Sequence, residues 1–273
     1  MSGVLYIVAT PIGNLEDLSP RAQRILDEVD LIVAEDTRHS QTLLKQFGIK
    51  TPLQSLHEHN EAAKVEGLLQ QLQKGQSIAQ ISDAGTPLIN DPGFRLASAA
   101  RAADLEVSAI PGPSAPIVAL TLSGLPVSRF SFEGFVPVKA QAKQQFLDAL
   151  VAEPRTMLFF ESPRRVMDTL RVMMKCWGGE RRVAVARELT KLHEMVHHAP
   201  LAQLIPWMEE DENRQRGEFV LVAEGAPAVE EDRVEALRIV TLLAKELPPR
   251  KAAALAAEIT GVKKNQLYRM LME

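Results

Sequence analysis

Short apolar runs alternate with amphipathic segments along the first 125 residues. The runs are rich in Val, Ile and Leu and predict five strands, at residues 4–9, 30–36, 52–56, 76–82 and 106–112. The segments between them predict helices that begin at Ser19-Pro20, cover residues 37–48, run from Asn60 to Gly75, lie near 94–103 and begin at Ser114. This alternation is typical of a mostly parallel sheet that helices cover on both faces.

The pattern changes after residue 125. Strands with fewer intervening helices are predicted at 155–162, 181–189, 193–199 and 218–225, and they indicate a second sheet of mixed direction. The segment "APAVEED" resembles a linker, and three helices are predicted at 233–247, 250–259 and 263–271. We therefore predict an N-terminal α/β domain (1–125), a second α/β domain (126–226) and a C-terminal helical module like a helix-turn-helix (227–273).

Composition places the chain among ordinary soluble proteins. Of its 273 residues, 46% are hydrophobic and 24% are charged, and no apolar run reaches the length of about 20 residues that a membrane span needs. Cys176 is the only cysteine, and the N-terminus lacks the basic region of a signal peptide, so we expect a cytoplasmic protein with no membrane partner. The net charge of −4 gives no overall attraction to nucleic acid, which local basic patches would have to supply.

Unusual residues follow each of the five predicted strands of the first domain. These loops contain Thr10-Pro11-Ile12-Gly13-Asn14, Glu35-Asp36-Thr37-Arg38, His57-Glu58-His59-Asn60, Ser82-Asp83-Ala84-Gly85-Thr86-Pro87 and Pro111-Gly112-Pro113-Ser114-Ala115. In open α/β sheets, ligands bind at the carboxyl ends of the strands. We therefore expect all five loops to face one cleft.

The expected cleft does not have the sequence of a nucleotide-phosphate site. There is no G-x-G-x-x-G and no G-x-x-x-x-G-K-[ST], and Pro11 and Pro113 remove backbone N–H groups that a phosphate would use. The loops offer carbonyl groups and small side chains instead. They suit a cationic or zwitterionic ligand better than an anionic one.

Five motifs in fixed order carry a family resemblance. They are "VATPIGNLEDLSPRA", "VAEDTRHS", "ISDAGTPLINDPG", "IPGPSA" and "FFESPRR". In this order they resemble the tetrapyrrole methylase superfamily of S-adenosylmethionine-dependent methyltransferases, and within it the enzymes that methylate small-subunit ribosomal RNA. The resemblance covers the whole chain. It implies two α/β domains that hold S-adenosyl-L-methionine between them, a homodimer, and 2′-O-methylation of a cytidine ribose in small-subunit ribosomal RNA.

The resemblance also implies which residues bind the cofactor. Matched motif positions place around it Pro11, Ala84, Gly85, Thr86, Ile89, Ser114, Ala115 and Phe160. The tetrapyrrole enzymes usually have Gly-Asp-Pro where this chain has Gly85-Thr86-Pro87, which argues against a porphyrin substrate.

A ribose hydroxyl is a poor nucleophile until it loses its proton, so a base is expected to assist the transfer. The candidates are Glu35, Asp36, His57 and Lys191. We favour Lys191, because a lysine near a cationic cofactor would have a lowered pKa. Glu35 and Arg38 are the next catalytic candidates.

Other functions stay open at this point. The chain would also fit an enzyme that methylates a tetrapyrrole, or a non-catalytic RNA-binding assembly factor with a methylase fold. The RNA substrate would be either naked RNA or a subunit particle. His57 and His59 would suit zinc by their spacing, but no further ligand spacing supports them, and we expect no metal.

Two segments are basic in this acidic chain. Residues 155–191 contain nine Arg or Lys against four Asp or Glu, and residues 248–273 contain five against two. Such runs usually form a solvated face. Arg164 and Arg165 directly follow a predicted strand, so contact with RNA phosphate is an alternative for them. The C-terminal module would either grip RNA or clamp a domain or dimer interface.

Overall fold

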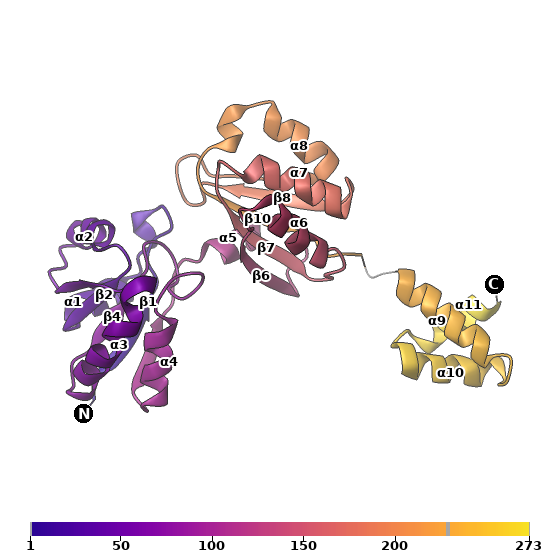
Figure 1. Cartoon of the computed structure of the whole chain (residues 1–273), viewed down its shortest axis with the longest axis horizontal. Helices are drawn as coiled ribbons and strands as arrows, with labels where there is room; N and C mark the ends of the chain where they lie inside the picture. Colours follow the sequence, from indigo (N-terminus) through magenta and orange to yellow (C-terminus); the bar gives the residue numbers. More distant parts are fainter. Residues whose placement is uncertain (1, 228–229, 273) are drawn as a thin grey trace. The chain divides into compact units, whose positions relative to one another are not determined.

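The computed structural model describes residues 2–227 and 230–272 (Figure 1). The chain falls into two compact units. The first contains Met1–Asp148 and Thr156–Glu224, and the second contains Ala149–Arg155 and Gly225–Glu273. The first unit carries both predicted α/β sheets, and the second carries the predicted helical module. No helix among the described residues is both long enough and apolar enough to cross a membrane.

The first sheet is entirely parallel, as the strand–helix alternation predicts. Its order is β3-β2-β4-β1-β5. The strands are β1 (Val4–Val8), β2 (Leu31–Ala34), β3 (Leu53–Ser55), β4 (Ile78–Gln80) and β5 (Glu106–Ile110). The connecting helices are η1 (Leu15–Asp17), α1 (Pro20–Glu28), α2 (Thr37–Gln46), α3 (Glu58–Gln73), α4 (Phe94–Ala102) and α5 (Ala115–Leu122).

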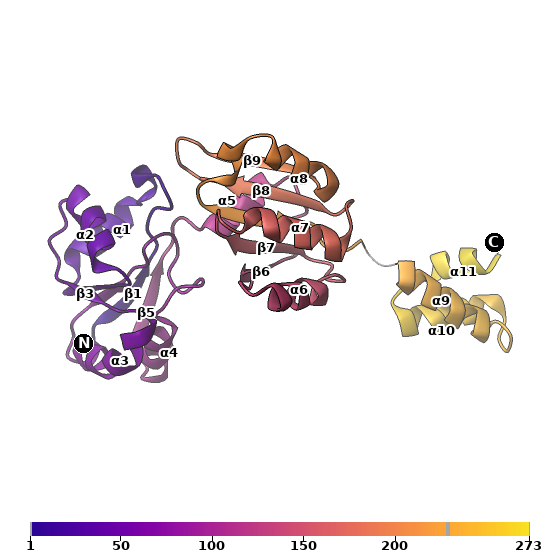
Figure 2. The same ribbon diagram turned by 45° about the horizontal axis from the view of Figure 1, so that its top comes forward.

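Helices cover both faces of this sheet, and the strand residues alternate between two apolar cores. Val8 and Ile32 pack with α1 and α2, whereas Leu5 and Val33 pack with α3 and α4. Figures 1 and 2 show the same two pairs of helices on opposite sides. The helix ends follow local chemistry. Ser19 caps α1 as predicted, but α3 begins after His57, and Asn60 completes a capping box there instead of serving as the cap.

The second sheet is mixed, again as predicted. Its order is β6-β7-β10-β8-β9, in which β6 and β7 are parallel and the other pairs are antiparallel. The strands are β6 (Phe130–Phe135), β7 (Thr156–Glu161), β8 (Arg182–Arg187), β9 (Met195–Pro200) and β10 (Phe219–Ala223). β10 is the central strand of this sheet, although it is the last of the five in the sequence. α5 packs Ala119 and Leu120 against this sheet, although its residues precede the predicted boundary at 125.

The second half contains more helices than the pattern predicted. Besides α7 (Val166–Trp177), it has α6 (Ala140–Ala149), α8 (Leu201–Glu209) and the short η2 (Glu212–Gln215). Sequence analysis missed α6 and α8, and it also missed β6. α8 carries Pro206 inside the helix, which conceals it from a pattern search because proline usually ends a helix. α7 and α8 lie side by side in both views (Figures 1 and 2).

The C-terminal unit contains α9 (Glu230–Leu243), α10 (Pro249–Thr260) and α11 (Lys264–Met272), close to the predicted helices. They share a core of small and branched side chains: Ala236, Val240, Ala252, Ala253, Ala256 and Leu267. The alanines of α10 let the other helices approach closely, and Gly261 ends α10 with a φ of +73°. This unit has an apolar core of its own.

Candidate active site

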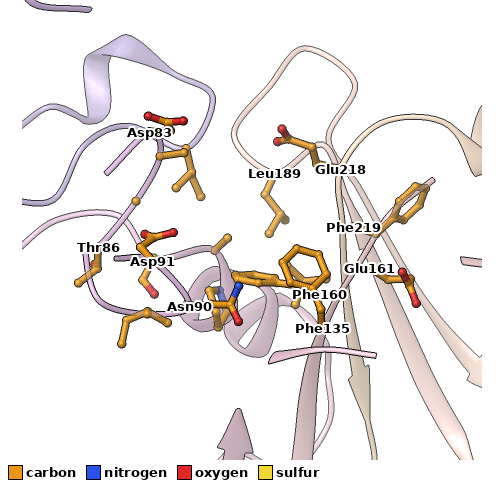
Figure 3. A pocket seen from close by; sticks show the side chains of 18 of the residues that line it. Asp83, Thr86, Asn90, Asp91, Phe135, Phe160, Glu161, Leu189, Glu218 and Phe219 are labelled. Atoms are coloured by element: carbon orange, nitrogen blue, oxygen red, sulfur yellow. The ribbon is translucent and has the colours of Figure 1, made fainter. Parts of the chain in front are cut away.

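A cavity of about 510 Å³ lies at the carboxyl ends of the first sheet and is closed by the second sheet (Figure 3). This volume is in the usual range for a small-molecule site. One wall follows β1, β2, β4 and β5 and contains Ile12, Glu35, Asp83, Ala84, Gly85, Thr86, Ile89, Asn90, Asp91, Ser114, Ala115 and Pro116. The other wall contains Phe135, Phe160, Glu161, Ser162, Pro163, Ala186, Leu189, Glu218, Phe219 and Val220.

Hydrogen bonds join three of the loops that form the first wall. The Thr10 and Gly85 backbones bond to each other in both directions, at 2.9 and 3.0 Å. The Thr86 hydroxyl donates to the Pro113 carbonyl at 2.9 Å. Thr86 therefore fixes the loop after β5, which gives this departure from Gly-Asp-Pro a structural role.

Gly85 lies where a side chain has no room. Its φ of +79° is in the left-handed region, and an added Cβ would lie 3.1 Å from Ile12 Cγ2. Gly112 is also crowded, but its added Cβ would meet Ala9 Cβ of the loop after β1 at 2.9 Å. Gly112 is thus required for packing between two loops of the protein.

Three carboxylates line the first wall: Glu35, Asp83 and Asp91. Burial raises the pKa of Asp91 to about 6; a hydrogen bond from Ser82 opposes this rise, and the charges of Glu35 and Asp83 add to it. Burial also raises the pKa of Glu35, with a further contribution from Asp83. Asp83 Oδ1 accepts from the Asp36 backbone N–H at 3.1 Å, which connects the loops after β2 and β4. Carboxylates held this close favour a cationic ligand group.

The opposite wall is aromatic and aliphatic. The Phe160 ring centroid lies 5.4 Å from that of Phe135 and 4.9 Å from that of Phe132. Figure 3 shows Phe135, Phe160 and Leu189 facing the side of the cavity that carries Asp91 and Thr86. This wall offers apolar surface to a flat ring, opposite carboxylates that suit a positive charge.

A buried ionic network supports the aromatic wall from behind. The Glu161 side chain is 0% exposed and accepts from the Ser162 backbone N–H at 2.7 Å, from Arg165 Nη2 at 2.7 Å and from the Thr169 hydroxyl at 2.6 Å. Lys143, whose side chain is 1% exposed, donates to Thr169 Oγ1 at 3.1 Å and to Asp168 Oδ2 at 2.5 Å. The turn between β7 and α7 is therefore held rigidly.

Lys191 lies beside the first wall, but its ionisation differs from the prediction. An added Cβ at Gly13 would lie 2.5 Å from Lys191 Cγ, so the lysine stem crosses the loop after β1. Burial alone would lower the pKa of Lys191. Hydrogen bonds to Glu218 at 2.7 Å and Glu188 at 3.0 Å outweigh burial and raise the pKa. The predicted lowered pKa is wrong, because the neighbouring carboxylates stabilise the ammonium form.

The other catalytic candidates differ in whether they reach the cavity. Glu35 lines the cavity. Arg38 is 91% exposed and pairs with Asp36, the residue that caps α2, at 3.1 Å. His57 does not line the cavity; its Nε2 lies 2.9 Å from Asn60 Nδ2 in the cap of α3. Among residues 2–227 and 230–272, no group of three or more His, Cys, Asp or Glu is placed to hold a metal ion.

The structure brings together most of the residues expected at a cofactor. The cavity is lined by Ala84, Gly85, Thr86, Ile89, Ser114, Ala115 and Phe160, whereas Ile12 lines it in place of the expected Pro11. Sequence analysis missed Asp91, Leu189 and Glu218. Asp91 follows the loop "DAGTPLIN" closely enough to have been considered. Leu189 lies just after β8, and Glu218 lies just before β10. Only the order of the strands in the sheet brings these two residues to the cavity.

Comparison with protein families gives two matches. Residues 4–205 match the model described as Tetrapyrrole (Corrin/Porphyrin) Methylases, and residues 230–273 match the model described as the RsmI C-terminal HTH domain. The chain is similar over nearly its whole length to proteins named ribosomal RNA small subunit methyltransferase I. The protein of Escherichia coli O157:H7 is 54% identical, covering 99% of this chain and 95% of its own. The protein of Pseudomonas aeruginosa is 52% identical, covering 100% and 98%.

Solved structures share the fold at low sequence identity. The methyltransferase CobJ superposes with a TM-score of 0.61 at 17% identity, covering 82% of this chain and 95% of its own. The uroporphyrin-III-C-methyltransferase from Thermus thermophilus superposes with a TM-score of 0.57 at 19% identity, covering 81% and 94%. Both likenesses concern the arrangement of strands and helices alone.

Proposed function

The chain belongs to the tetrapyrrole (corrin/porphyrin) methylases, and from this membership we propose that it transfers a methyl group from S-adenosylmethionine to small-subunit ribosomal RNA. The sequence identity of 54% over nearly the full length to a ribosomal RNA small subunit methyltransferase carries this proposal. The match of residues 230–273 to the C-terminal domain of such enzymes supports it independently.

The cavity residues fit the cofactor. S-adenosylmethionine carries a methyl group on a positively charged sulfur, which makes that methyl electrophilic. The carboxylates of Glu35, Asp83 and Asp91 complement a positive charge, while Phe135 and Phe160 offer apolar surface to the adenine ring. Gly85 has no side chain to cover its backbone at the cavity wall. We assign Ala84, Thr86, Ile89, Ser114 and Ala115 to the same contact surface.

Two residues carry the proposed proton chemistry. Asp91 lines the cavity with a pKa of about 6, so its carboxylate is charged at neutral pH and is more basic than an ordinary aspartate. We propose that an Asp91 carboxylate oxygen accepts the proton of the attacking ribose hydroxyl, with Glu35 as the second candidate. Lys191 remains protonated beside Glu218, and we propose that it orients that carboxylate at the cavity wall.

The finer parts of the proposal concern the target and the assembly. We propose that the acceptor is the 2′-hydroxyl of a cytidine, presented in cytoplasmic small-subunit RNA or in a subunit particle. We also propose a homodimer. Exposed apolar side chains on and beside the edge strand β6 support it, among them Phe130 and Val138, the latter 75% exposed.

Labelled methyl transfer tests the function. The full chain, labelled S-adenosylmethionine and small-subunit particles from a strain lacking the gene should give one labelled cytidine ribose. Naked RNA and a porphyrinogen serve as parallel acceptors. Transfer to the porphyrinogen alone would assign a tetrapyrrole methylase, and transfer to none of the three would favour an assembly factor.

A further inference from the structure

Two neighbouring arginines after β7 have different surroundings. Arg165 turns inward: Nη2 pairs with Glu161 at 2.7 Å, Nε donates to Ser162 Oγ at 3.0 Å, and Nη1 donates to the Val136 carbonyl at 2.9 Å. Arg164 is exposed and makes no side-chain hydrogen bond or ion pair with any residue in the described part of the chain. The same turn thus contains one arginine that holds the protein together and one whose guanidinium is free.

The backbone at Arg164 is fixed close to the cavity. Pro163, the preceding residue, lines the cavity, and consecutive Cα atoms are about 3.8 Å apart. The buried Glu161 carboxylate holds Ser162 and Arg165 on either side of this position. Figure 3 shows Glu161 beyond Phe160, away from Asp91. Arg164 therefore extends from a rigid turn at the cavity rim.

The charge of the cavity favours a cation at this rim for an RNA substrate. The charged residues that line the cavity are Glu35, Asp83, Asp91, Glu161 and Glu218, and no Lys, Arg or His is among the lining residues of the described chain. Arg165 pairs with Glu161 and Lys191 pairs with Glu218, but a ribose enters with phosphates on both sides, and the carboxylates of the first wall repel them. Interaction with a cation just outside the cavity would offset that repulsion.

Three other cations in segments beside cavity residues already have partners. Lys191 bonds to Glu188 and Glu218, Arg187 donates to the carbonyls of Arg216 and His193, and Arg38 pairs with Asp36. In the described part of the chain, no carboxylate or carbonyl competes with a phosphate for the Arg164 guanidinium. A planar guanidinium also matches a phosphate geometrically, with two parallel N–H donors.

We propose that Arg164 binds a backbone phosphate beside the nucleotide that is methylated. The inference rests on the proposed function, because it names a substrate contact of the same site. Arg164 would anchor the RNA at the rim while the cavity receives the ribose. Arg165 has the other task, since its guanidinium holds the turn from inside.

The test compares Arg164→Ala with Lys175→Ala in the full-length protein. Lys175 is also exposed and lies in the last turn of α7, the helix that follows Arg164, so its removal changes the net charge equally at the end of α7 far from the cavity. With unmethylated small-subunit particles as substrate, Arg164→Ala should raise the KM for particles about fivefold to tenfold, with kcat and S-adenosylmethionine affinity unchanged. Its binding should also depend less on salt, by about one phosphate contact. Lys175→Ala should behave as wild type.

Each outcome separates this inference from the proposed function. An Arg164→Ala protein with the KM and salt dependence of Lys175→Ala would overturn the phosphate contact and leave the methyltransferase assignment standing. Arg164→Lys should recover most of the affinity, because it keeps the charge; a lysine variant as weak as alanine would contradict an electrostatic contact. A wild-type protein that neither binds nor methylates the particles would overturn both proposals.

Discussion

Individual residues at the cavity owe their ionisation to the fold, which sequence alone does not reveal. Lys191 was expected to have a lowered pKa beside a cationic cofactor, yet hydrogen bonds to Glu218 and Glu188 raise its pKa. Asp91 was not singled out, yet burial brings its pKa to about 6. Glu188 is only three residues from Lys191, but the fold brings Glu218 to Lys191 and buries Asp91, and no local motif could have indicated either.

The Asp91 carboxylate should make cofactor affinity depend on pH. Below about pH 6 the side chain takes up a proton and loses the charge that attracts a cation, so the affinity for S-adenosylmethionine should fall as the pH is lowered through that value. A bound cation favours the charged form, which gives the same sign. Calorimetric titrations between about pH 8 and about pH 5 measure the effect.

The Asp91→Asn variant provides the control for this pH dependence. It should bind S-adenosylmethionine weakly at every pH and show a flatter profile, because the titrating group is gone. A variant profile with the same fall near pH 6 would assign the titration to another residue, of which Glu35 is the first to examine.

Gly85→Val should abolish measurable binding of S-adenosylmethionine. The added side chain would press on Ile12 and occupy the wall where the backbones of Thr10 and Gly85 pair. Gly48→Val is a matched control, because Gly48 has a similar φ of +71° but no atoms within 4 Å of an added Cβ. Both variants should lose roughly 1–2 kcal/mol of stability from the left-handed backbone. If Gly48→Val also failed to bind, strain and not the cavity would explain the loss.

At the scale of helices and strands, the hydrophobic pattern of the sequence predicts an element correctly where that pattern is regular. The parallel sheet and its helices were predicted because each strand is a short apolar run and each helix begins with a recognisable cap, such as Ser19 before Pro20. Around the second sheet the pattern is less regular. β6 contains Gly134 and a shift in register between Phe132 and Phe135, so its sequence does not have the pattern of a regular strand. α8 contains Pro206, so its sequence does not have the pattern of a regular helix. Most residues expected at the cofactor do line the cavity, because their loops follow strands with a regular pattern.

The buried ionic network around Glu161 should stabilise the folded protein. Glu161→Ala leaves Arg165 and the buried Lys143–Thr169 pair without their shared carboxylate, and we expect a loss of about 3 kcal/mol in the free energy of unfolding. Glu209→Ala removes the exposed ion pair with Arg171 and should change stability by less than about 1 kcal/mol. Urea denaturation of both variants gives the comparison. Equal losses would show that the buried network adds nothing beyond a surface pair.

At the scale of the whole molecule, the C-terminal unit has its own apolar core, so we expect that it can be removed without unfolding the rest of the protein. Its helices α9, α10 and α11 pack around their own alanines and Leu267. Removing every residue after Ala226 keeps the Ala226 N–H bond to the Glu153 carbonyl and should leave S-adenosylmethionine affinity unchanged. We expect the truncated protein to bind small-subunit RNA more weakly and with less dependence on salt, because basic residues of 248–273 are lost.

The same truncation also tests the clamp alternative. Unchanged RNA affinity and an unchanged salt slope would remove the module from RNA binding. If sedimentation also showed that a dimer of the full chain becomes a monomer on truncation, the helices would hold an interface between copies. Filter binding at several salt concentrations, with the full chain in parallel, distinguishes the two roles.

The position of β10 in the second sheet has a consequence for how the protein is made. β10 lies between β7 and β8 but is the last strand of the sheet to leave the ribosome, so the edges of β7 and β8 that it pairs with stay unpaired until it emerges. Glu218, Phe219 and Val220 of the cavity wall arrive with it. The cavity that we propose for the cofactor is therefore complete only after about residue 223 has emerged and β10 has entered the sheet.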